Sequence, residues 1–149
     1  SKANQTLTDD EEWALNEYIS SGSYKINAPL REGIELTQEQ QELVRNLDSA
    51  LEKMPVYTGT VYRSISSQDI DIQRFWAEHT VGSNIVYLPY TSSSTEIYDE
   101  TMDIQMEIES KTARDLRSYN EQEQEILFPR ECEFEIVKRK GNRLWLKEI

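Results

Sequence analysis

The spacing of the apolar residues changes once along this chain, close to Pro55, and no other feature restricts the possible folds so strongly. Over residues 43–51, apolar side chains recur at the spacing of an α-helix with one buried face. Over residues 102–108, apolar and polar side chains alternate, which is typical of a β-strand with one buried face. Helices therefore come first and strands follow, and this order predicts an α+β fold.

Two capping boxes, beginning at Thr8 and Thr37, mark where the N-terminal helices start. In each, the threonine is followed three residues later by Glu or Gln, so that side chain and backbone can cap one another. The first helix is expected to break at residues 21–23, before a short amphipathic segment over residues 24–30. The second capped helix is expected to end before Pro55.

The rest of the chain is expected to form short strands separated by turns. A first strand is expected over residues 59–65, a short helix over residues 70–76 and a second strand over residues 84–88. The chain is expected to close with a hairpin that turns near Gly141. No repeat, linker or low-complexity tract divides the sequence, so we expect one domain over residues 1–149.

The composition excludes several classes of function. The chain carries 28 acidic and 16 basic side chains, and a net charge of −12 is unsuited to nonspecific nucleic-acid binding. No apolar stretch approaches the roughly 20 residues of a membrane-spanning helix, and the first residues lack the apolar segment of a secretory signal. His79 and Cys132 are the only residues of their types, so no metal site is expected, and we place His79 at a turn or on the surface.

Two carboxylates stand just before an apolar strand, at Glu123 and Glu125. They can belong to a solvated acidic loop, which is the usual role of such a run. In an extended backbone, however, residues two apart project to the same side, so both carboxylates can also share one site at the mouth of a sheet. Such a pair can divide the work on one substrate, because one carboxylate opposes a developing positive charge while the other orients a nucleophile.

Arg63 lies in the middle of the first expected strand, on the same face as Val61 and Ile65 under strict alternation. A half-buried arginine needs a partner, which is either a carboxylate in the core or a phosphate or diphosphate of a ligand. A serine-rich run over residues 91–95 follows the second strand and Tyr90. This run is either a turn or a set of hydroxyls that brace a neighbouring catalytic side chain.

Taken in order, an arginine on an early strand, an aromatic-x-Ser-x-Ser element and a Glu-x-Glu before an Ile-Leu-Phe-Pro strand resemble the mono-ADP-ribosyltransferases. The set is similar to the arginine-modifying branch, which includes the clostridial binary toxins, other bacterial actin-modifying enzymes and the vertebrate ecto-transferases. The N-terminal segment, with Tyr18, Tyr24 and residues 30–33, also resembles the opening helices of that family. The family's second cofactor-binding Arg or Asn has no clear counterpart in this sequence.

The resemblance implies that NAD binds in a cleft between two small, mainly antiparallel sheets packed as a split sandwich, with no metal ion. It assigns NAD binding to Arg63, Ser92, Ser93, Ser94 and Tyr98. Arg63 would pair with the diphosphate, the serines would brace the pocket, and Tyr98 would stack on nicotinamide. Tyr119, just before the acidic pair, would contact the target protein.

The resemblance also assigns the chemistry to the two glutamates. Glu125 would bind the 2′-hydroxyl of the nicotinamide ribose and place negative charge beside the anomeric carbon as its bond to nicotinamide lengthens. Glu123 would hold the guanidinium of a target arginine and take up its proton. A glutamate at this first position, where other branches carry glutamine, implies arginine as the acceptor.

The resulting expectation is an NAD-dependent mono-ADP-ribosyltransferase that modifies an arginine of a target protein. The resemblance further implies a monomeric toxin or effector domain, delivered by a bacterium into the cytosol of a target cell and inhibited by a cognate immunity protein in the producer. No membrane partner is expected. Three alternatives stay open, namely an NAD glycohydrolase, an enzyme that modifies a nucleic acid, and a noncatalytic binding module.

Overall fold

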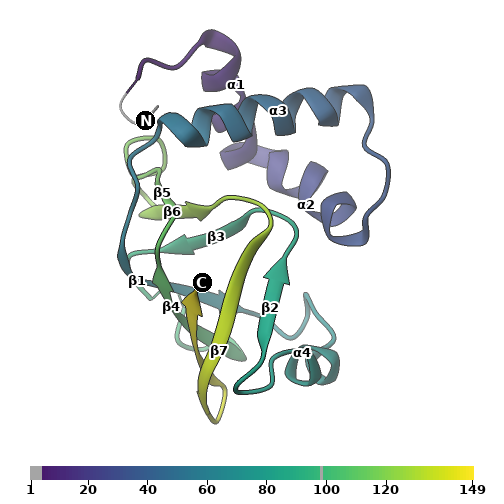
Figure 1. Cartoon of the computed structure of the whole chain (residues 1–149), viewed down its shortest axis with the longest axis vertical. Helices are drawn as coiled ribbons and strands as arrows, with labels where there is room; N and C mark the ends of the chain where they lie inside the picture. Colours follow the sequence, from purple (N-terminus) through teal and green to yellow (C-terminus); the bar gives the residue numbers. More distant parts are fainter. Residues whose placement is uncertain (1–4, 98) are drawn as a thin grey trace.

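The computed structural model describes residues 5–97 and 99–149, so Tyr98, expected to stack on nicotinamide, lies outside the described residues. The N-terminal helices gather at one end of the molecule over part of a twisted sheet, and the last helix lies at the other end (Figure 1). The helical segments are α1 (Asp9–Glu17), a π-helical turn (Tyr18–Gly22), α2 (Ser23–Glu32), α3 (Gln38–Lys53) and α4 (Ile72–Glu78). The strands are β1 (Gly59–Ile65), β2 (Asn84–Tyr87), β3 (Thr91–Ser94), β4 (Ile104–Ser110), β5 (Arg114–Asp115), β6 (Glu125–Phe128), β7 (Cys132–Lys140) and β8 (Arg143–Glu148).

Both predicted capping boxes are present. The Thr8 hydroxyl accepts from the Glu11 backbone N–H at 3.2 Å, and the Glu11 carboxylate accepts from the Thr8 N–H at 2.7 Å. Thr37 and Gln40 make the same reciprocal pair at the start of α3. The caps satisfy N–H groups that have no partner within the helix, which is why these short motifs fix the two helix starts.

The expected break at residues 21–23 is wrong, because the chain stays helical there through the π-helical turn. Gly22 makes this turn possible. A Cβ at position 22 would lie 2.9 Å from the carbonyl oxygen of Glu17 and 3.3 Å from a methyl carbon of Leu43 on α3. The residue that we expected to end the helix is therefore the one that lets α1 continue into α2 while packed against α3.

The strands form one mixed sheet in the order β2-β7-β8-β4-β1-β3-β6-β5, and among the pairs of described strands only β4 and β8 run parallel. The α+β class is confirmed, but the two expected sheets are joined. The joint is the edge between β1 and β3, where the register contains the single pair Tyr62–Ser94, whereas β1 and β4 pair from Gly59 to Ile65. So short a joint lets the sheet change direction between its two halves.

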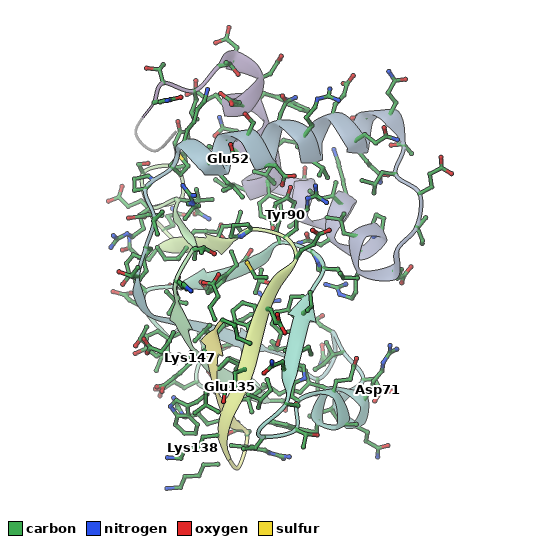
Figure 2. The ribbon with its side chains drawn as sticks, in the orientation of Figure 1. Glu52, Asp71, Tyr90, Glu135, Lys138 and Lys147 are labelled. Atoms are coloured by element: carbon green, nitrogen blue, oxygen red, sulfur yellow. The ribbon has the colours of Figure 1, made fainter. Side chains whose placement is uncertain are left out.

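Strand β6 separates two apolar clusters. Leu127 packs among buried residues of the helices, whereas Ile126 and Phe128 pack among buried residues of the sheet. Alternation along the strand therefore places Glu125 on the same side as Leu127, facing the helices. Tyr90 lies between helices and sheet (Figure 2), and its hydroxyl donates to Asp48 on α3.

His79 lies at the bend that follows α4, as expected, but it is buried rather than on the surface, with 5% of its surface exposed. Its Nδ1 atom lies 2.7 Å from the carbonyl oxygen of Phe75 and its Nε2 atom 2.6 Å from the hydroxyl of Tyr87. Its ring stacks on that of Phe75. His79 therefore ties α4 to β2. No helix within the described part of the chain is long and apolar enough to cross a membrane.

Candidate functional site

Glu125 is the first residue of β6 and is buried, with 4% of its surface exposed. It pairs with Ser94 of β3 and lies on the helix-facing side of the strand. Burial raises the pKa of Glu125 above the ordinary glutamate value, and the charge of Glu123 acts in the same direction. Hydrogen bonds from Asn120 and Ser92 and the positive charge of Arg63 oppose this rise. Glu125 is thus a buried carboxylate surrounded by donors.

Glu123 converges with Glu125, although not in the way that the sequence suggested. The chain between them is not extended, because Gln124 has a left-handed backbone conformation with φ of 49°. The two carboxylates meet instead through Asn120, whose Nδ2 atom donates to an oxygen of each at 3.0 Å. Glu125 is buried while Glu123 is exposed, so one carboxylate lies within the fold and the other faces solvent.

The loop that carries Glu123 is anchored at both ends. Leu116 is fully buried among the helices, and its N–H donates to the carbonyl of Glu125 at 3.0 Å. The carbonyl of Leu116 accepts from the N–H of Asn120 at 2.8 Å. At the other end, the N–H of Thr95 after β3 donates to the carbonyl of Gln124 at 3.2 Å. These bonds hold the loop against the ends of β3 and β6.

Arg63 shares a face of the sheet with Val61, as predicted, because it pairs with buried Met106 while Val61 pairs with buried Ile108. Its Nη1 atom donates to the carbonyl of Ser92 at 2.8 Å. The bond joins β1 to β3, whose register contains the single pair Tyr62–Ser94. Arg63 thus uses a backbone carbonyl to hold a positive charge near Glu125.

The serine run is a strand rather than a turn, and alternation divides its members. Ser92 and Ser94 lie on the same side as Glu125, and the Ser92 hydroxyl hydrogen-bonds its carboxylate. Ser93 points to the other side, where its buried hydroxyl donates to the carbonyl of Ile126 at 2.7 Å. The structure therefore brings Ser92 and Ser94 to the site, while Ser93 holds β3 to β6.

Tyr18 and Asn27 join the site from the helices, and the sequence did not assign either of them a role. The Tyr18 hydroxyl lies 3.4 Å from that of Ser92, and Asn27 Nδ2 donates to Tyr18 at 3.0 Å. A carboxylate only accepts, so the Ser92 proton is committed to Glu125 and the Tyr18 proton to Ser92. The bonds run in one direction, from Asn27 through Tyr18 and Ser92 to Glu125.

Asn27 also contributes an atom with unused hydrogen-bonding capacity. Its Oδ1 atom is buried and has no partner in the structure. Buried polar atoms in native proteins are usually hydrogen-bonded, and an exception calls for an explanation. Because Nδ2 of the same amide is committed to Tyr18, Oδ1 is held in place as an acceptor beside the donor chain.

Tyr119 lies on the loop before the acidic pair, and its side chain is partly buried against the apolar cluster of the helices. Its N–H donates to the carbonyl of Leu116 at 2.9 Å. Burial raises the pKa of its phenol, and Glu12 on α1 adds to the effect. Within residues 5–97 and 99–149, no group of three or more His, Cys, Asp or Glu side chains could hold a metal ion.

Comparison with known proteins places this arrangement in a family. A model of the ADP-ribosyltransferase exoenzyme family matches residues 1–146. The chain belongs to this family. The match agrees with the resemblance inferred from Arg63, the serine element and the two glutamates. It also supports the expectation that this domain uses NAD as a substrate.

Two curated relatives of the family match most of the chain. A putative NAD(+)–arginine ADP-ribosyltransferase, Mav, of Mycobacterium avium (strain 104) is 34% identical over 143 residues, which are 89% of this chain and 16% of the relative. The NAD(+)–protein-arginine ADP-ribosyltransferase Tre1 of Serratia proteamaculans (strain 568) is 26% identical over 135 residues, which are 89% of this chain and 30% of the relative. The chain thus spans less than a third of either relative.

A solved structure of the family has the same fold. Exoenzyme S from Pseudomonas aeruginosa, in complex with human 14-3-3 protein beta and bound to carba-NAD, superposes with a TM-score of 0.78 at 18% sequence identity. The match covers 95% of this chain and 74% of the exoenzyme chain. At this identity the likeness establishes the fold, and the function has to be argued from the site.

Proposed function

We propose that this domain is an NAD-dependent mono-ADP-ribosyltransferase that cleaves the bond between nicotinamide and ribose and transfers ADP-ribose to an arginine of a target protein. The observation that carries the proposal is the convergence of Glu123 and Glu125 on one amide, with Glu125 buried at the end of a chain of donors. The relatives whose names describe arginine ADP-ribosyltransferases support it.

The residues around Glu125 suit NAD. Arg63 supplies a guanidinium whose planar fork matches a phosphate oxygen pair, and its bond to Ser92 fixes its position. The buried Oδ1 atom of Asn27 is an acceptor without a hydrogen-bond partner in the structure, and NAD carries amide and hydroxyl donors. Arg63 would therefore hold the diphosphate, and Asn27 would accept from a polar group of the nucleotide.

Glu125 would lower the barrier to cleavage of the glycosidic bond. NAD supplies a leaving group that already carries positive charge, so the departing nicotinamide keeps the electron pair of the broken C–N bond and becomes neutral. As that bond breaks, positive charge develops on the ribose carbon. The carboxylate of Glu125, already oriented by Ser92 and Asn120, opposes this charge without rearrangement.

Glu123 would select and activate the acceptor. It is exposed on its loop, where a protein surface can reach it, and it faces the same amide as Glu125. A carboxylate binds a guanidinium by charge-assisted hydrogen bonds. The guanidinium nitrogen forms the new C–N bond to ribose and loses one proton, which Glu123 accepts and passes to water. Arginine fits this site because it brings both the nucleophile and the positive charge.

The structures of this fold include bacterial toxins and a type III effector, which supports delivery from a bacterium into a target cell. We accordingly propose a monomeric toxin or effector domain that acts in the cytosol of the target cell, with a cognate immunity protein in the producer. The relatives extend well beyond the matched segment, so further domains of a longer protein can contribute to delivery and to target choice.

Tagged NAD and agmatine, a small guanidine, test the function. Replacement of Glu125 by glutamine is expected to lower both transfer to agmatine and hydrolysis of NAD by about 100-fold or more, because both reactions need its charge. Replacement of Glu123 by glutamine is expected to abolish transfer and to leave measurable hydrolysis. The variant Gln122→Ala, changed at an exposed position of the same loop, is the control.

Full transfer by Glu125→Gln would refute the assignment. Hydrolysis without transfer to agmatine or to any protein in a lysate would identify a glycohydrolase instead. Label that nucleases remove would identify a nucleic-acid acceptor. Mass spectrometry of a labelled protein would locate the modified residue.

A further inference from the structure

The Asn120 side chain donates to both glutamates, and the sequence assigned it no role. We propose that Asn120 is a positioning residue that holds the carboxylates of Glu123 and Glu125 in one shared geometry. The inference rests on the proposed transferase function, because it concerns how the two glutamates cooperate in transfer.

Both N–H donors of the Asn120 side chain are committed to the two carboxylates. A side-chain NH2 group has two N–H donors, and here one goes to Oε2 of Glu123 and the other to Oε1 of Glu125, both at 3.0 Å. One planar group therefore sets the separation and the relative orientation of both carboxylates. A serine or threonine hydroxyl has a single proton and could not donate to both.

The backbone of Asn120 is held in place as firmly as its side chain. Its N–H donates to the carbonyl of buried Leu116 at 2.8 Å, and its carbonyl accepts from the N–H of Glu125 at 3.4 Å. Asn120 and Glu125 are thus joined twice, once through the backbone and once through the side chains. The amide projects from a fixed point of the loop, so it positions the exposed carboxylate of Glu123 relative to the buried one of Glu125.

The pair of hydrogen bonds from Asn120 to Glu123 and Glu125, here called the bridge, also affects the pKa of Glu125. Glu125 faces the negative charge of Glu123 from the loop, the positive charge of Arg63 from β1 and the phenol of Tyr18 from the π-helical turn, while Ser92 on β3 donates to it. Burial and Glu123 raise the pKa of Glu125, and the bond from Asn120 works against that rise. Because the amide is neutral, it brings the two carboxylates together without repelling an incoming guanidinium.

The consequences differ between the two reactions. Hydrolysis of NAD needs Glu125 alone, whereas transfer needs Glu125 and Glu123 in register. Without Asn120, Glu123 would be free to turn into solvent, since it is exposed and would lose the hydrogen bond that its carboxylate accepts from the amide. Loss of the bridge should therefore lower the rate of transfer more than the rate of hydrolysis. It should also move the acid limb of both pH–rate profiles to higher pH.

The test compares Asn120→Ala and Asn120→Asp with the wild type and with the control Gln122→Ala. Asn120→Ala is expected to lower the kcat of transfer to agmatine by about 10- to 100-fold, as a misplaced catalytic group does, with a smaller loss of hydrolysis. Asn120→Asp keeps the size of the side chain but replaces its donors with a third negative charge. It should shift the acid limb further upward than alanine does.

The outcomes separate this inference from the proposed function. A wild-type domain that neither cleaves NAD nor modifies agmatine would contradict the function. Wild-type activity together with normal transfer and an unmoved acid limb in Asn120→Asp would overturn the role of Asn120. A uniform loss of both reactions at every pH, with reduced thermal stability, would show that Asn120 supports the loop only. The titration of the Glu125 carboxyl by ¹³C NMR adds a readout without turnover, in which both Asn120 variants must raise its pKa.

Discussion

At the scale of single residues, the site places a carboxylate where the fold disfavours its charge. Glu125 is buried, and burial raises its pKa above that of the unfolded chain, with Glu123 adding to the effect. The folded state therefore favours the protonated carboxyl more than the unfolded chain does. The stability that this difference contributes is lost as the pH rises through the folded-state pKa of Glu125. At neutral pH the ionised carboxylate destabilises the fold, and this is the form that the proposed chemistry requires.

Replacing Glu125 by glutamine should therefore remove both the activity and this cost. We expect Glu125→Gln to be more stable than the wild type at neutral pH, by on the order of 1 kcal/mol, as is common when a functional charge is removed. The difference should shrink as the pH falls toward the ordinary glutamate value, because Glu125 then becomes neutral in the wild type as well.

Urea unfolding of both proteins across that pH range measures the difference. Glu123→Gln is the matched control, because Glu123 is exposed and its replacement should change stability by less than about 0.5 kcal/mol. A variant Glu125→Gln that is less stable than the wild type at neutral pH would mean that the donors around the carboxylate outweigh its burial.

At the scale of elements, the π-helical turn begins at Tyr18 and leads into α2, which carries Asn27. Nine positions separate the two residues, and at about 100° per residue an uninterrupted α-helix would place them on opposite faces. A π-turn accommodates one additional residue, so the following helix is rotated back by about one residue. The bond of 3.0 Å between Asn27 and Tyr18, and with it the donor chain to Glu125, therefore spans this turn rather than a regular α-helix.

Gly22→Ala tests the turn. The new Cβ would lie 2.9 Å from the carbonyl oxygen of Glu17, which is backbone and cannot easily move. We expect a loss of about 1–3 kcal/mol in the free energy of unfolding, as for other overpacked sites, and a raised KM for NAD as Asn27 and Tyr18 separate. Thermal unfolding and NAD kinetics measure the two effects.

Ser21→Ala, in the same turn, provides the control for this substitution, and it should change stability by less than about 0.5 kcal/mol. If Gly22→Ala proved as stable and as active as Ser21→Ala, the turn would not be what positions Asn27.

The features predicted correctly from the sequence are those that local interactions determine. The capping boxes at Thr8 and Thr37 involve residues three apart, and β1 has the bounds expected from its composition. Distant contacts explain the errors. Four polar residues form β3 because that strand pairs with β1 and β6, and His79 is buried because Phe75 and Tyr87 satisfy its ring.

The candidate site was likewise only partly accessible from the sequence. Arg63, Ser92, Glu123 and Glu125 follow from the family resemblance, and the structure brings them together. The residues that connect them were missed. Asn120 reaches both glutamates only because the loop turns back on itself at Gln124, and neither composition nor periodicity records such a turn.

At the scale of the whole molecule, the acidic excess is distributed differently in space than along the chain. Residues 96–125 carry ten acidic and three basic side chains, −7 of the total of −12. Glu107 and Glu109 lie on β4, which β1 and β3 separate from β6, and they contact Arg143 and Thr60. Glu96 and Glu121 are both exposed. Glu96 follows the end of β3, and Glu121 lies on the loop that carries Glu123. A hydrogen bond from the N–H of Thr95 to the carbonyl of Gln124 connects these two segments.

This distribution predicts a local effect on acceptors that carry many positive charges. The exposed charges of Glu96 and Glu121 should attract an arginine-rich peptide toward Glu123, and salt should weaken that attraction because the Debye length falls from about 10 Å at 0.1 M to about 3 Å at 1 M. We expect kcat/KM for such a peptide to fall steeply with salt while hydrolysis of NAD changes little. The double variant Glu96→Gln/Glu121→Gln should lower kcat/KM for the peptide at low salt and flatten its salt dependence.

The double variant Glu133→Gln/Glu135→Gln removes the same charge from exposed positions of β7, in the other half of the sheet (Figure 2). If the position of the charges matters, this second pair should leave the kinetics with the peptide nearly unchanged. Equal losses from the two pairs would mean that net charge alone attracts the acceptor. No loss from either pair would mean that Glu123 recognises its arginine through short-range contacts only.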